Sequence, residues 1–130
     1  MPLNGNCSME PSIHTRIVSY VLALIFATSG GAKLLSLPFE VEAFERWGYS
    51  PVFMYTIGIL EVIGAIGLLA PRVSALASFC LALLMLGAIT THLIHGEWPM
   101  LVVAVAIAFA AGCRGWSGRA DIRNLVGAFR

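Results

Sequence analysis

The stretch GILEVIGAIGLLAP (residues 58–71) is apolar except for one carboxylate, that of Glu61. It belongs to a run that begins near residue 51 and is long enough to cross about 30 Å of hydrocarbon as a helix. An acidic residue at the centre of such a helix costs roughly 2.5–3.5 kcal/mol on insertion scales. We therefore expect Glu61 to face the protein interior, where it is either paired or protonated.

Three further apolar runs of similar length accompany this one. The 130 residues are 58% hydrophobic and only 12% charged, whereas about a quarter of the residues in a soluble domain are charged. The sequence therefore predicts an all-α integral membrane protein, a four-helix transmembrane bundle that occupies residues 17–116. Its spans are expected at about residues 17–35, 51–70, 73–95 and 98–116.

The segments outside the spans have their own character. Residues 1–16 are polar and are predicted to be a disordered tail, which leaves the first span to act as the targeting element. The outer loop LPFEVEAFERWGYS (residues 37–50) has apolar residues at helical spacing and predicts a short amphipathic cap over the bundle. Residues 117–130 form a basic amphipathic tail, which either lies on an anionic membrane surface or simply keeps the chain soluble.

The arginines predict the orientation, because they gather on one side of a four-span topology. By the positive-inside rule, both termini and the loop between the second and third spans face the cytoplasm of an inner or plasma membrane. The arginines on that side are Arg16, Arg72, Arg114, Arg119, Arg123 and Arg130.

Lys33 is the candidate partner for Glu61. It lies toward the outer end of the first span, and its side chain could reach down to the carboxylate or extend up to the interface. Ser29 shares its helical face, and Thr91 and His92 end the third span at a similar depth. We expect Ser29, Lys33, Glu61, Thr91 and His92 to form a ligand-binding cluster, with Glu61, Lys33 and His92 as the candidate catalytic groups.

The number and spacing of the cysteines and histidines argue against a metal or redox centre. Cys7, Cys80 and Cys113 are far apart and odd in number, which disfavours a disulfide framework or a zinc site. Cys80 and Cys113 are expected to be small core residues. The three histidines do not have the spacing of a haem or metal site, and no basic patch indicates nucleic-acid binding.

Three motifs resemble the DoxX/DoxD-like family of small four-helix membrane proteins. They are FATSGGAKL (residues 26–34), GILEVIGAIGLL (residues 58–69) and TTHLIHGE (residues 90–97), and the resemblance extends over about residues 17–111. It implies a four-helix transmembrane bundle in which the family's lysine, acidic residue and histidine are Lys33, Glu61 and His92. The family's known roles are a subunit of a thiosulfate:quinone oxidoreductase, partners in other redox complexes, a maturation factor for methylamine dehydrogenase, and receptor assembly.

Three functions stay open at this point. The first, which the small-residue helix faces and short loops favour, is a non-catalytic membrane subunit or assembly factor that docks a partner protein, for example a redox protein. The second is a small membrane enzyme or quinone-site subunit, in which Glu61 and His92 exchange protons and Lys33 polarises a carbonyl. The third is a binder of lipid or a hydrophobic metabolite. The bilayer is the expected environment. The sequence leaves the cofactor open, with a quinone among the options, and it also leaves homo-oligomers open.

Overall fold

The computed structural model describes residues 12–130, which form six helices and no strand. The four long helices are α1 (Ile13–Leu34), α3 (Pro51–Leu69), α4 (Ser74–Ile94) and α5 (Trp98–Ser117). The two short helices are α2 (Pro38–Trp47) and α6 (Arg119–Ala128). Each long helix is long and apolar enough to cross a membrane. The predicted all-α fold with four spans is confirmed.

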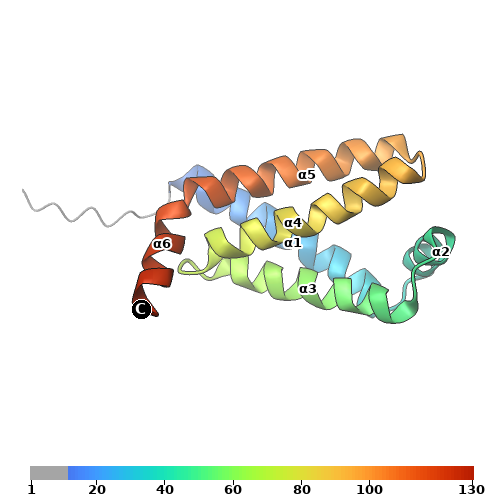
Figure 1. Ribbon diagram of the computed structural model, residues 1–130, viewed down its shortest axis with the longest axis horizontal. Coiled ribbons are helices and arrows are strands. Elements are labelled where there is room, and N and C mark those ends of the chain that lie inside the picture. Colours follow the sequence, from blue (N-terminus) through green and yellow to red (C-terminus); the bar gives the residue numbers. More distant parts are fainter. Residues whose placement is uncertain (1–11) are drawn as a thin grey trace, which may run out of the picture.

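The long helices run alternately up and down, as two helical hairpins. Helix α1 packs mainly against α3, and α4 packs mainly against α5, with fewer contacts between the two hairpins. Figure 1 shows α2 at one end of the bundle and α6 at the opposite end. We call these the α2 end and the α6 end.

Local sequence signals explain where these helices begin and end. The Ser12 and Ser50 side chains accept hydrogen bonds from the backbone N–H groups of Thr15 and Phe53, and so cap α1 and α3. Helices α2, α3 and α5 each have a proline in the first turn, where the missing N–H carries no penalty. Gly48 ends α2 with a φ of 81°, a left-handed conformation that glycine adopts without strain.

The buried core is small, and the outer surface is strongly apolar. Large side chains such as Ile63, Ile66 and Phe109 are 60%, 63% and 74% exposed, as expected for residues that face lipid tails. Cys80 and Cys113 are also exposed, so the expectation that they belong to the core is wrong. Each lies on the outward face of its helix, which the apolar character of the runs could not reveal.

The N-terminal part of α1 differs from the expected tail. Helix α1 begins at Ile13, so residues 13–16 are helical. Ser12 caps this helix, and residues 1–11 of the predicted disordered tail lie outside the described residues. At the other terminus, the basic tail contains helix α6, which has no buried residue.

Candidate functional site

Lys33 and Glu61 form an ion pair between α1 and α3. Lys33 Nζ lies 3.1 Å from Glu61 Oε2, and the two residues are only 7% and 6% exposed. Of the two conformations expected for Lys33, the structure therefore contains the one that reaches Glu61. Because both groups lie in a membrane span, each charge offsets the desolvation cost of the other.

Two glycines bring α1 and α3 close enough for this contact. A Cβ on Gly30 would lie 2.7 Å from the carbonyl oxygen of Gly58 and 3.0 Å from the Cβ of Glu61. A Cβ on Gly58 would lie 3.0 Å from the Cβ of Lys33. Small residues at a helix crossing permit such an approach in membranes, and here they place the two charged residues side by side.

Ser29 and Glu40 complete this inner cluster. Lys33 Nζ donates a hydrogen bond to Ser29 Oγ (2.8 Å), and Ser29 Oγ donates one to Glu61 Oε1 (3.3 Å). From α2, Glu40 Oε1 lies 3.4 Å from the same ammonium group. Apart from its ion pair with Lys33, Glu61 Oε2 accepts no hydrogen bond from the described residues. One lysine thus lies between two carboxylates, one of which has an oxygen with spare capacity to accept.

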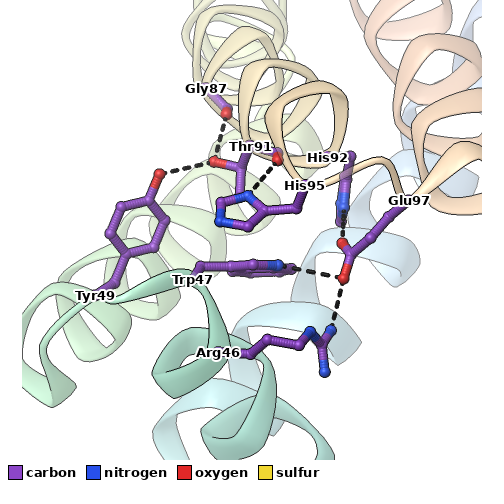
Figure 2. Close-up of polar contacts among 8 residues, drawn as sticks. All are labelled: Arg46, Trp47, Tyr49, Gly87, Thr91, His92, His95 and Glu97. Atoms are coloured by element: carbon purple, nitrogen blue, oxygen red, sulfur yellow. Dashed lines mark hydrogen bonds and ion pairs between the residues drawn. The ribbon is translucent and has the colours of Figure 1, made fainter.

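Glu97 is the centre of a second, outer cluster. Figure 2 shows its carboxylate group between the side chains of His92 and Arg46. His92 Nδ1 lies 2.7 Å from Glu97 Oε2, while Arg46 Nη2 (2.6 Å) and Trp47 Nε1 (3.3 Å) donate to Oε1. Partial burial raises the pKa of Glu97, but the hydrogen bonds from these three side chains outweigh it and lower the pKa to about 2. Because an ionised carboxylate only accepts, Nδ1 of His92 carries a hydrogen in this contact.

Thr91 joins the outer cluster to the aromatic side chains of the cap. Its hydroxyl bonds to the Tyr49 hydroxyl (2.9 Å) and donates to the carbonyl of Gly87 (3.0 Å). The Trp47 ring meets the His92 ring edge-on, with 5.3 Å between centroids. Helix α2 is therefore attached to α1 through Glu40 and to the α4–α5 turn through Arg46 and Trp47.

The inner and outer clusters line one cavity of about 570 Å³. All five predicted ligand-binding residues, Ser29, Lys33, Glu61, Thr91 and His92, border it. They do not form one bonded cluster, because Thr91 and His92 bond to the cap and to Glu97 rather than to Lys33 or Glu61. Most of the remaining wall is apolar and comes from α1, α3, α4 and α5, while α2 covers the α2 end.

Sequence reasoning missed four residues that shape this cavity. Glu40, Arg46 and Tyr49 lie in the segment that was predicted to be the cap, and Glu97 ends the motif TTHLIHGE, but none of the four was predicted to belong to the site. The available signal was the helical spacing of α2, because Glu40 and Phe44 are four residues apart and share a face. No group of three metal-ligating side chains occurs within residues 12–130 that could hold an ion.

Fold and site together define a small integral membrane protein with four spans and a polar cluster inside its apolar bundle. The sequence model of the DoxX-like family matches residues 17–113, and the chain belongs to this family. The uncharacterized protein YdgD of Bacillus subtilis (strain 168) is 30% identical over 96 residues, which cover 70% of this chain and 84% of that relative. No solved structure matches the chain.

Proposed function

We propose that this protein binds, within the membrane, an apolar small molecule that carries a polar head. The observation that supports the proposal is the cavity of about 570 Å³ with apolar walls and the Lys33–Glu61 pair at its border. Pockets for small molecules usually measure roughly 300–1,000 Å³ and combine apolar walls with a few placed polar groups. Quinones belong to this chemical class.

The polar groups fit a head that can both accept and donate hydrogen bonds. Lys33 can donate to a carbonyl or hydroxyl oxygen, in competition with Glu40, which is its longest ionic contact at 3.4 Å. Glu61 Oε2, which receives no hydrogen bond from the described residues, can accept from a hydroxyl group. A head that enters the cavity would thus meet a donor and an acceptor on neighbouring helices.

The binding experiment compares three purified proteins by extraction and mass spectrometry of co-purifying small molecules. The wild type is measured beside Glu61→Gln, which removes the charge at the cavity, and beside Glu42→Gln. Glu42 is exposed on α2 and does not line the cavity, so it is the matched control. We expect an apolar metabolite in the wild type and in Glu42→Gln, and its loss from folded Glu61→Gln.

The opposite result would favour the docking role that the sequence predicts. If all three proteins retain only bulk lipid, or the same partner protein in equal amounts, the cavity is not a ligand site. Glu61 would then serve only to pair with Lys33 inside a membrane subunit or assembly factor.

We propose further that the α6 end faces the cytoplasm. Five arginines of α6 and the adjacent helix ends and turn support this, since basic residues are retained on that side; they are Arg16, Arg72, Arg114, Arg119 and Arg123. In a cysteine-free background, Arg130→Cys should resist an impermeant maleimide in intact cells, whereas Glu42→Cys should react. Reaction of Arg130→Cys alone would reverse the assignment.

A further inference from the structure

A second groove lies at the α6 end, on the far side of the bundle from the ligand cavity. It has a volume of about 570 Å³ and is formed by the start of α1, the α3–α4 turn, the end of α5 and helix α6. Its polar lining consists mainly of Ser12, Thr15, Arg72, Arg114, Asp121 and Asn124. Since the groove lies where the four spans end, it is at the depth of the lipid head groups.

Arg114 is the buried cation of this groove and is only 7% exposed. Its Nε donates to Ser19 Oγ (2.7 Å) and its Nη2 donates to Ser74 Oγ. Both partners are neutral hydroxyl groups. Among residues 12–130, no carboxylate lies within 4.0 Å of this guanidinium group.

Among residues 12–130, the charges around Arg114 leave the groove positive. Arg72 lines it from the exposed α3–α4 turn, and Asp121 lines it from α6. Asp121 attracts Arg114 electrostatically, but one carboxylate offsets only one of the two arginines. Gly118 keeps α6 close to the arginine, because a Cβ there would lie 2.9 Å from Arg114 Nη1 and 2.6 Å from the Cβ of Ala75.

From this arrangement we infer that the groove binds the phosphate group of an anionic phospholipid. Guanidinium groups bind phosphate through directed, charge-assisted hydrogen bonds, and basic pockets between membrane helices suit anionic head groups. The hydroxyls of Ser12 and Thr15 can donate to the remaining head-group oxygens. Leu125 and Ala128 of α6 supply apolar surface in the same groove, next to which the glycerol and acyl chains can lie.

Native mass spectrometry of the detergent-purified full chain, with added phosphatidylglycerol or phosphatidylcholine, tests this site. Arg72→Gln is the main variant, since Arg72 is exposed and its replacement leaves the helix packing intact. Arg123→Gln is the matched control, because Arg123 is an exposed α6 residue outside the groove. We expect Arg72→Gln to weaken phosphatidylglycerol binding about fivefold, the equivalent of about 1 kcal/mol, and Arg123→Gln to change it little.

Arg114→Lys adds a test of the buried group, because it keeps the charge but removes the planar fork of donors. If Arg114→Lys stays folded, as measured by circular dichroism, it should also lose phosphatidylglycerol binding.

Equal binding of phosphatidylcholine, or equal losses in Arg72→Gln and Arg123→Gln, would overturn the inference. Binding of inorganic phosphate at micromolar concentration to the wild type but not to Arg72→Gln would assign the groove to free phosphate instead of a lipid. Glu61→Gln should leave phosphatidylglycerol binding unchanged, which separates this site from the ligand cavity.

Discussion

The two ends of the bundle accommodate charge in different ways. At the α2 end, Lys33 lies between Glu61 and Glu40, and Glu97 accepts a hydrogen bond from Arg46. At the α6 end, the buried Arg114 is held by the hydroxyl groups of two serines. One end thus neutralises its charges within the chain, and the other leaves a cation whose neighbours are mostly neutral.

This difference indicates what each end depends on. At the α2 end, ion pairs between residues of the chain itself attach α2 over the cavity and stabilise this end of the bundle. Hydroxyl groups orient Arg114 but do not neutralise it, so the α6 end depends on what surrounds it at the membrane surface. Substitutions at the α2 end should therefore change stability most, whereas those at the α6 end should respond to the lipid.

The largest effect is expected for Lys33→Met, which removes the cation shared by Glu61 and Glu40. Loss of one partner of a buried pair leaves the other charge uncompensated and typically costs about 3–5 kcal/mol. The free energy of unfolding in detergent, from thermal or denaturant titration, measures this loss. Adding Glu61→Gln to Lys33→Met should restore part of it, since the stranded carboxylate is then gone. Additive effects of the two substitutions would show that the pair does not couple.

Gly30→Ala should separate the helices that hold this pair. Its Cβ would lie 2.7 Å from the Gly58 carbonyl oxygen, which belongs to the backbone and cannot rotate away. Overpacking of this kind costs about 1–3 kcal/mol in the free energy of unfolding. Gly31→Ala is the control, because a Cβ there meets no atom within 4 Å and alanine favours a helix. Equal effects of the two substitutions would argue against close packing as the basis of the α2-end cluster.

The sequence predicts the fold well because membrane helices carry a strong signal. Four runs of about 20 apolar residues determine the number of spans, and the helical spacing of residues 37–50 predicts α2. The contact between Lys33 and Glu61 can also be predicted from the sequence, because an acidic group at mid-membrane depth needs a partner. These inferences require only the depth of a residue in the membrane and the face of the helix on which it lies.

The rest of the site depends on tertiary contacts that sequence periodicity does not encode. Glu40 reaches Lys33 only because α2 folds back over the bundle, and Glu97 meets Arg46 across 51 positions of the chain. From the sequence, Arg114 is one of the arginines at the predicted cytoplasmic ends of the spans. In the structure it is buried, and Ser19 of α1 and Ser74 of α4 accept its hydrogen bonds. Cys80 illustrates the same limit, since an apolar run does not say which of its faces meets lipid.

An effect no larger than that of Gly30→Ala is expected at the α6 end for Ser74→Ala. This substitution leaves one donor of the buried Arg114 without its hydroxyl acceptor, at a cost of about 1–3 kcal/mol. Ser78→Ala is the matched control on the same helix, because the buried Ser78 Oγ has no hydrogen-bond partner among the described residues. We expect Ser78→Ala to be neutral or stabilising in thermal unfolding. Anionic lipid should reduce the loss in Ser74→Ala, and a loss independent of lipid would contradict the contrast between the two ends.

The smallest effect is the acid sensitivity that Glu97 gives to the outer cluster, because its ionic partner Arg46 is 59% exposed and solvent screens the pair. Its folded-state pKa of about 2 lies below its ordinary value of 4.5, so its contribution to stability is complete above about pH 4.5. That contribution is lost as the pH falls from 4.5 toward 2.

Glu97→Gln should therefore be less stable than the wild type at pH 6, and the two should converge near pH 2. Glu45→Gln, an exposed α2 substitution, should follow the wild-type curve. Trp47 fluorescence, measured after Trp98→Phe and Trp116→Phe, should change near pH 2, because the folded-state carboxylate of Glu97 takes up its proton there and the indole N–H loses its ionised acceptor. An acid transition unchanged by Glu97→Gln would mean that the Lys33 cluster, and not Glu97, holds α2 in place.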